Sequence, residues 1–337
     1  MTTQVYRIDD ENEYRKAGPT DLIALIPNAG ANQLFLPKNK IETLVRSIFD
    51  KEYIHLSGPS GSAKSSVIEA LAVPGNFLAV CKALGFSGVK PLKIYPVEMA
   101  TFESPGELFF RRALKEGSTF DEKSPLVRAL HMAEKEEEQY SVLIWLREMG
   151  RVHSSSIQGG LLNLMHKPAV IIPSGEKIDT RQIAWIADSN YQADTDSTHT
   201  LVTLDDALKR RFTCHITLDY LNGEQEIQIL HEIMANRQSV VEQQELIPKI
   251  VKLGHIIRQQ RLEGNLQSIT PPTIYGFLAA LNMADRLPHF SMQDIMSHTL
   301  LGNATLPDSK IAQTVYNEVF GLQADPEQES AVGGSWF

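Results

Sequence analysis

The chain has 337 residues, of which 42% are hydrophobic and 22% are charged, as expected for a globular protein with one large domain or two ordinary ones. The 41 acidic residues outnumber the 32 basic ones, and the net charge of -9 argues against a surface that binds nucleic acid through its overall field. The apolar runs fall far short of the roughly 20 residues that a membrane helix needs, and the polar start is unlike a secretory signal, so we expect a cytoplasmic protein without a membrane span.

The N-terminal part of the sequence favours an extension that precedes a folded domain. Residues 1–35 mix charged and turn-forming residues with one short apolar patch, "DLIALIP", and we expect this segment to pack on a core. The apolar residues from Ile41 to Ile48 then follow the spacing of one helix face. After them comes "YIHLSG", a β-rich run that ends on glycine, and "KSSVIEALAV", which has helical spacing. This order predicts a strand, a loop and a helix.

The loop between that strand and that helix carries the most specific motif. "GPSGSAKSS" fits the phosphate-binding pattern G-x-x-x-x-G-K-[ST], with Ala63 at the second glycine position. Small residues let successive backbone N–H groups surround a phosphate at the positive end of a helix. We expect Lys64 to reach the β- and γ-phosphates of ATP, Ser65 to hold Mg²⁺, and Ala63 to be tolerated if its φ is negative. The candidate nucleotide-binding residues are Gly58, Pro59, Ser60, Gly61, Ser62, Ala63, Lys64, Ser65 and Ser66.

The bland alternative for this loop is a glycine-rich turn that only connects strand and helix. The lysine, the hydroxyl and both flanking elements disfavour it. The two cysteines, Cys81 and Cys214, lie far apart without the spacing of zinc ligands. We therefore expect neither a disulfide framework nor a zinc site, and we interpret both cysteines as small core residues.

The remaining pattern predicts an α/β fold followed by helices. Strands are expected at "LKIYPVEM", "VLIWL", "IAWIADSN" and "CHITLDY", an alternation typical of a mostly parallel sheet. From Gly223 onward the apolar stripes predict helices throughout. We assign 36–220 to an α/β nucleotide-binding domain, 221–322 to a smaller all-α lid domain and 323–337 to a flexible tail.

Several segments resemble the AAA+ ATPases, in particular their MoxR-like and dynein-related branch, over about residues 35 to 290. The family's second acidic motif has four apolar residues, Asp-Glu, and a turn that ends in Asn-Arg, and "LIWLREMGR" matches it without a gap. The resemblance implies that Glu148 polarises the attacking water and that Arg151 is the family's arginine. It leaves Arg147 where the Mg²⁺-supporting aspartate belongs. This implies that ATP hydrolysis is weakened, with abolished hydrolysis as the alternative. The Arg147 side chain has three alternatives: it points inward and opposes metal binding, it pairs with an acid, or it faces solvent.

Further segments are similar to the signatures that follow in this family. "IAWIADSN" resembles the sensor-1 strand, which implies that Asn190 lies beside the γ-phosphate, although an asparagine at a strand end is also a common turn former. "AVIIPSGEKIDTRQ" matches the hairpin that this branch inserts before sensor 1. "LVTLDDALKRRF" resembles the arginine-finger segment, which implies Arg211 as a finger acting on the neighbouring subunit, with Arg210 one position away as the alternative.

Two segments depart from the family or leave its pattern open. The sensor-2 arginine is missing, because "SITPPTIYGFLAAL" has Thr273 in that region and no arginine before Arg286. "ESPGELFFRR" occupies the place of substrate-facing loops, but we interpret Phe109 and Phe110 as core residues.

The resemblance implies a ring-shaped homo-oligomer, usually a hexamer, that binds ATP and Mg²⁺. Family members commonly act as chaperone-like remodelers or assembly factors, often with a von Willebrand factor A-domain partner. One alternative is a degenerate scaffold that binds ATP without turnover and holds partner proteins. A second is a nucleic-acid motor or defence-system ATPase, which the acidic charge disfavours.

Overall fold

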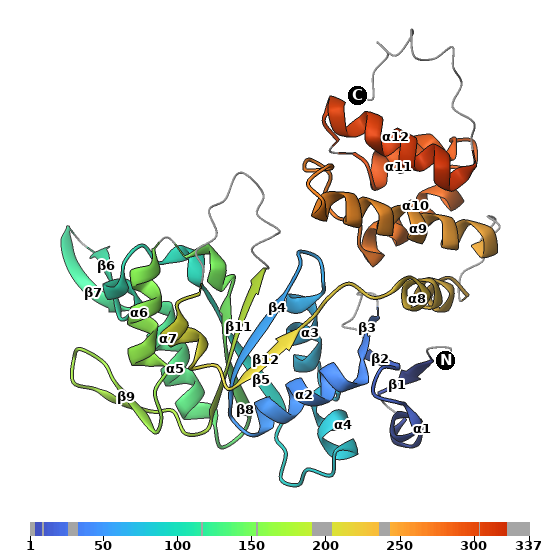
Figure 1. Cartoon of the computed structure of the whole chain (residues 1–337). Coiled ribbons are helices and arrows are strands. Elements are labelled where there is room, and N and C mark those ends of the chain that lie inside the picture. The colour runs from blue at the N-terminus through green and yellow to red at the C-terminus, as the bar shows by residue number, and fades with distance from the viewer. Residues whose placement is uncertain are drawn as a thin grey trace. The chain divides into compact units, whose positions relative to one another are not determined.

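The computed structural model describes residues 4–8, 10–25, 33–115, 117–152, 154–190, 204–235, 243–302 and 304–321. The chain forms two compact units, Met1–Asp219 and Tyr220–Phe337 (Figure 1). The predicted tail, including Trp336 and Phe337, lies outside the described residues.

The first unit is built around a five-stranded parallel sheet with the order β12-β4-β11-β8-β5. The strands are β4 (Tyr53–Gly58), β5 (Leu92–Glu98), β8 (Ser141–Arg147), β11 (Ile183–Asn190) and β12 (Cys214–Thr217). All the predicted strands are therefore present, and β4 and β11 match the predicted runs residue for residue. Because the strands are parallel, their carboxyl ends meet at one edge of the sheet, where ligands bind in open α/β folds.

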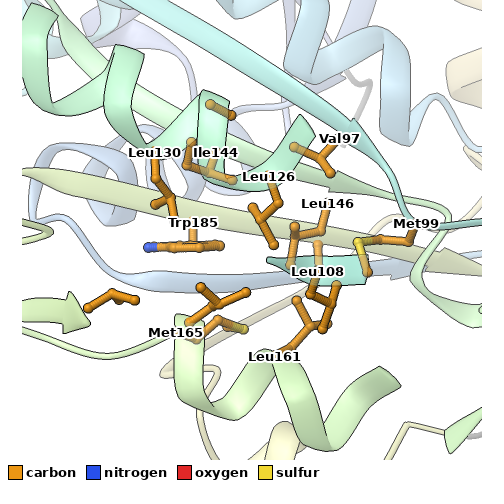
Figure 2. Close-up of a cluster of buried hydrophobic side chains, with 14 of the residues drawn as sticks. Val97, Met99, Leu108, Leu126, Leu130, Ile144, Leu146, Leu161, Met165 and Trp185 are labelled. Atoms are coloured by element: carbon orange, nitrogen blue, oxygen red, sulfur yellow. The ribbon is translucent and has the colours of Figure 1, made fainter. Parts of the chain in front are cut away.

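Helices cover both faces of this sheet, as its apolar strands require (Figure 1). One face packs against α2 (Lys38–Phe49), α3 (Lys64–Ala72) and α4 (Asn76–Ala83), and we call this the α3 face. The other packs against α5 (Pro125–Glu136) and α6 (Ser155–Leu164), and we call it the α5 face. Figure 2 shows the α5-face core, where Leu126 and Leu130 of α5 and Leu161 of α6 surround Ile144, Leu146 and Trp185. The first unit therefore contains the parallel α/β sheet predicted from the sequence, with helices on both faces.

The N-terminal segment packs on the α3-face core, as expected for an extension. It contains α1 (Glu11–Lys16) and a small sheet of β1 (Val5–Arg7), β2 (Leu22–Leu25) and β3 (Leu34–Pro37). Tyr14, Ile23 and Leu36 are buried in the same cluster as the residues of α2 and α3. The small sheet itself was not predicted, since its strands are only three or four residues long and their pairing is not visible in the local pattern.

Two antiparallel hairpins project from the first unit. β9 (Ala169–Ile171) pairs with β10 (Lys177–Asp179), which confirms that the segment before β11 forms a hairpin. The second hairpin joins β6 (Phe110–Lys115) to β7 (Ser118–Lys123) and follows two short 3₁₀ turns, Met99–Thr101 and Pro105–Leu108. Sequence analysis missed it because its strands are mostly exposed and charged. Phe109 and Phe110 are half-buried against the α5-face core, in line with a packing role.

The second unit contains only helices among its described residues. They are α8 (Gly223–Ala235), α9 (Gln243–Leu262), α10 (Ile274–Arg286), α11 (Met292–Thr299) and α12 (Leu306–Phe320). Their apolar stripes form one separate core. The predicted fold class, a parallel α/β sheet followed by a smaller helical part, is therefore confirmed.

The structure also tests two expectations from composition, the burial of the two cysteines and the lack of a membrane-spanning helix. Both cysteines are free thiols; Cys81 is buried as expected, whereas Cys214 is only half-buried. Within the described ranges, no single helix is long and apolar enough to cross a membrane, and α3 with α4 meets the criterion only as a pair bent by 87°.

Candidate nucleotide-binding site

The phosphate-loop motif lies at the carboxyl edge of the sheet, between the last residue of β4 and the first residue of α3. β4 ends at Gly58 and α3 begins at Lys64, so residues 59–63 form the loop. A Cβ atom at Gly58 would lie 2.0 Å from the backbone oxygen of Leu218 and 2.7 Å from Ser62 Oγ, which only glycine avoids. Gly61 has a φ of 76°, in the left-handed region that glycine adopts without strain.

Ala63 corrects one expectation from the sequence. We expected a negative φ, but Ala63 has φ 67° and ψ 19°, so a Cβ-bearing residue occupies the left-handed conformation that the motif's second glycine would hold. The loop must turn sharply here to start α3 at the next residue. For an alanine this conformation costs about 1 kcal/mol. Because Ala63 is also the N-cap, α3 begins without a side-chain cap from its N-cap residue, which favours an anion at its first amide groups.

Lys64 is buried, with 6% exposure, and its ammonium bonds to its own loop. Nζ donates to the carbonyl oxygens of Gly58 at 2.9 Å and Pro59 at 2.7 Å, and lies 3.5 Å from Ser62 Oγ. A phosphate oxygen would be a stronger, charged acceptor than these carbonyls. Ser65 and Ser66 are half-buried in the first turn of α3. The loop thus has the donors and the close backbone approach that a nucleotide phosphate requires.

Glu148 follows β8 directly in a strained conformation. Its φ of 53° and ψ of 48° are left-handed, and the 3₁₀ turn Met149–Arg151 begins at the next residue. Non-glycine residues in this region are uncommon and tend to occur at functional sites. The Glu148 side chain is 43% exposed, and its Oε2 lies 3.3 Å from Nη1 of Arg151. The carboxylate is therefore accessible to solvent and paired with the residue that the resemblance names as the family's arginine.

Arg147 pairs with an acid on the neighbouring strand. Its Nη1 lies 2.6 Å from Glu98 Oε1, and its guanidinium lies 4.7 Å from the centre of the Trp145 ring. Glu98 and Arg147 are register partners on β5 and β8, so the side chain reaches toward the β5 side of β8, whereas β4 and its loop lie on the other side. Of the alternatives for Arg147, the structure shows the pairing with an acid.

Asn190 lies next to the phosphate loop. It is the last residue of β11, is half-buried, and is the register partner of Gly58 on β4. Adjacent strands lie about 4.8 Å apart, so the amide side chain is one strand away from the start of the loop. Sequence reasoning alone could not bring these two residues together, because the strand order does that.

A site residue that the sequence analysis missed is Asp188, two residues before Asn190. Asp188 is buried, with 5% exposure, and its Oδ1 accepts a hydrogen bond of 2.6 Å from Trp145 Nε1. Burial raises the pKa of this carboxyl, while the bonds from Trp145 and from the Glu148 backbone and the charge of Lys64 act in the opposite direction. An acid inside the apolar run "IAWIAD" was the signal that could have revealed it.

Arg210 and Arg211 are not brought to the phosphate loop of their own chain. Both are exposed and follow the short helix α7 (Asp206–Lys209). The next residues lead into β12, and the Thr213 backbone N–H donates to Tyr53 O at the first residue of β4. The loop begins at the other end of β4, so about five residues, or roughly 16 Å, separate the two positions along the strand.

The described residues contain no cluster of three His, Cys, Asp or Glu side chains arranged to hold a metal ion. Thr273 is the N-cap of α10 and accepts a bond of 3.5 Å from the Gly276 backbone, so the residue in the sensor-2 region caps its helix.

Comparisons with known proteins find only solved structures that are distantly similar to this chain. No protein-family model and no curated protein matches the chain. ORC2 from Aeropyrum pernix, solved in ADPNP and ADP complexes, is 12% identical, with a TM-score of 0.46 over 88% of this chain and 71% of that one. A mutant of Thermotoga maritima RuvB is 12% identical, with a TM-score of 0.48 over 89% and 82%. The FIGL-1 AAA domain in complex with ADP is 14% identical, with a TM-score of 0.41 over 87% and 84%.

These likenesses do not define the fold, because all three TM-scores lie below 0.5. The strand order and the loop geometry of this chain establish the fold by themselves.

Proposed function

We propose that this chain is a ring-forming AAA+ protein of the MoxR-like type, which binds ATP and Mg²⁺ and acts as a chaperone-like remodeler or assembly factor with weakened hydrolysis. The observation that supports it most is the convergence of three sequence-distant segments at one sheet edge. The loop with the buried Lys64, the register partner Asn190 and the strained Glu148 end three neighbouring strands. A site that hydrolyses ATP needs a loop that binds the phosphates, and it needs a polar side chain and a carboxylate close to that loop.

Each residue has a role that its position supports. Lys64 would exchange the Gly58 and Pro59 carbonyls for phosphate oxygens, and the Ser65 hydroxyl would hold Mg²⁺. A bound Mg²⁺ would neutralise charge on the phosphates. Glu148 would accept the proton of the attacking water, and Asn190 would orient that water through its amide.

The two exposed arginines support assembly into a ring. They lie about a strand length from the loop of their own chain, so either one can serve a nucleotide only in a neighbouring subunit. A hexamer with a protein client or a von Willebrand factor A-domain partner follows from the resemblance.

The first experiment measures ATP affinity, ATP turnover and assembly of the full chain together. Lys64→Ala should abolish ATP binding, because it removes the buried ammonium. Glu148→Gln should retain binding and lose turnover. Lys82→Ala, which changes an exposed lysine paired with Glu11, is the matched control and should behave as wild type. Wild-type ATP affinity in Lys64→Ala, or a chain that stays monomeric with ATP and Mg²⁺ at micromolar concentration, would contradict the proposal.

The second candidate is a scaffold that binds ATP without hydrolysing it. The Arg147–Glu98 pair favours it, since a guanidinium replaces the metal-supporting acid. This candidate expects ATP binding without turnover in wild type, and turnover only in Arg147→Asp. Turnover in wild type that Glu148→Gln abolishes would exclude it.

A further inference from the structure

The position of Asp188 suggests a second carboxylate for the site. β11 lies between β4 and β8, so it is flanked by the strand of the phosphate loop and the strand of the acidic motif. Side chains two residues apart on a strand point to the same face, so Asp188 shares a face with Asn190 and with Ala184 and Ile186. Those two apolar residues belong to the core that contains Trp145 and the buried residues of α3. Asp188 therefore lies on the α3 face, which carries Lys64.

The contacts of Asp188 orient its carboxylate with neutral donors. Trp145 Nε1 donates to Oδ1 at 2.6 Å, and the backbone of Glu148 also donates a hydrogen bond. Trp145 lies two residues before Arg147 on β8, so the acidic-motif strand itself holds the acid of its neighbour. Neutral donors fix the direction of a carboxylate without cancelling its charge. The charges of Lys64 and Glu148 also act on this carboxylate, with Lys64 lowering its pKa and Glu148 raising it.

The charge balance of the site depends on this residue. Arg147 and Glu98 form a neutral pair directed toward β5, so neither supplies a negative charge to the loop. A buried carboxylate is costly unless it is paired with a cation. Asp188 is 5% exposed, and burial outweighs the charge of Lys64 in its raised pKa, so part of this cost remains in the ligand-free chain. A bound divalent cation would offset it, which is the trade between stability and function expected of a site residue.

We propose that Asp188 takes over, from the adjacent strand, the support of Mg²⁺ that the family's aspartate provides at the position of Arg147. With ATP and Mg²⁺ bound, its carboxylate would accept hydrogen bonds from water molecules on the metal, while Ser65 contacts the metal directly. This inference rests on the proposed nucleotide-binding function. It makes Asp188 a positioning residue, which affects Mg²⁺ binding and so the Mg²⁺-dependent part of the ATP affinity.

The test compares Asp188→Asn with wild type in the full chain. ATP affinity is measured in Mg²⁺ and in EDTA with a fluorescent ATP analogue, and binding of Mn²⁺ as a probe is followed by electron paramagnetic resonance. We expect unchanged affinity in EDTA and at least a tenfold loss of the Mg²⁺-dependent gain. The Tm of the ligand-free variant should equal or exceed that of wild type, because the amide oxygen can still accept from Trp145 and the buried charge is gone. Asp179→Asn, at a half-buried position of the hairpin strand β10 where the carboxylate pairs with Arg181, is the control and should keep the Mg²⁺-dependent gain.

A rescue variant separates metal support from a structural role. The double variant Arg147→Asp with Asp188→Asn places the carboxylate at the family position and should regain most of the Mg²⁺-dependent affinity. An unchanged Mg²⁺ dependence in Asp188→Asn, equal losses with and without Mg²⁺, or failure of the rescue would overturn the inference. Wild-type chain that binds no ATP in either condition would overturn the proposed function as well, so the two failures are distinguishable.

Discussion

At the scale of single residues, backbone strain is concentrated at the candidate site. Lys51, Ala63 and Glu148 are the non-glycine residues with positive φ among those that the structure describes, and the last two belong to the candidate site. Strain of this kind persists only where surrounding structure imposes it. At Ala63 the imposing element is the start of α3, and at Glu148 it is the turn that leaves β8.

We expect Ala63→Gly to raise the free energy of unfolding by up to about 1 kcal/mol, because relief of the left-handed strain exceeds the entropy cost of glycine. Ala70→Gly is the matched control. Ala70 lies inside α3, where glycine should lower stability by about 1 kcal/mol. Urea denaturation measures both, and equal signs for the two variants would show that the strain at Ala63 is negligible.

His55 predicts a pH dependence of stability. Burial lowers its pKa to about 4, with the charges of His215 and Lys209 acting in the same direction, and its Nε2 lies 2.8 Å from Ser189 Oγ. The unfolded chain binds this proton more readily, near its ordinary pKa of about 6.5. The contribution of the neutral His55 to the free energy of unfolding is therefore fully present above a pH of about 6.5. It is lost as the pH falls toward 4 and amounts to at most about 3 kcal/mol.

His55→Gln should flatten this pH profile, whereas His298→Gln, at an exposed position of α11, should not. Denaturation midpoints between pH 7 and pH 4 provide the measurement. A profile in His55→Gln as steep as in wild type would assign the loss to other groups.

At the scale of elements, α8 and α9 are joined by a buried ion pair. Arg258 Nη2 lies 2.9 Å from Glu226 Oε1 and its Nε donates to Pro272 O at 2.7 Å, while its guanidinium lies 4.1 Å from the Tyr220 ring centre. The guanidinium thus links α8, α9 and the segment before α10. His255 adds a contact of 2.8 Å to the same glutamate.

Arg258→Met should destabilise the helical unit by about 3–5 kcal/mol, since it leaves Glu226 buried without its main cation. The double variant Arg258→Met with Glu226→Leu should recover most of that loss. Hydrogen exchange of the α8 and α9 amides reports on this unit directly. Equal protection in the single and double variants would mean that the pair contributes through packing alone.

Elements with strong apolar periodicity were predicted well, and those made by long-range pairing were not. α2 and the sheet strands β4 and β11 were evident from local patterns. The β6–β7 hairpin and the three-stranded N-terminal sheet have short or charged strands, so only their pairing partners reveal them.

At the scale of the whole molecule, the exposed arginines predict complementation between subunits. Neither Lys64→Ala nor Arg211→Ala should turn over ATP alone, but an equimolar mixture should regain activity, because some interfaces then combine an intact loop with an intact arginine. The same experiment with Arg210→Ala identifies the finger. Mixtures that stay as inactive as the separate variants would argue against an arginine acting between subunits.

The sequence by itself determined the α/β class, the loop at residues 58–66, and the acidic strand with its arginine, because these depend on local patterns of apolar, small and charged residues. The tertiary structure decided three features. It showed that Arg147 pairs with Glu98, that Asn190 lies beside Gly58, and that Asp188 is buried against Trp145. The physical reason is the strand order, which places β11 between β4 and β8 and β5 on the other side of β8, and so joins side chains that no local pattern connects.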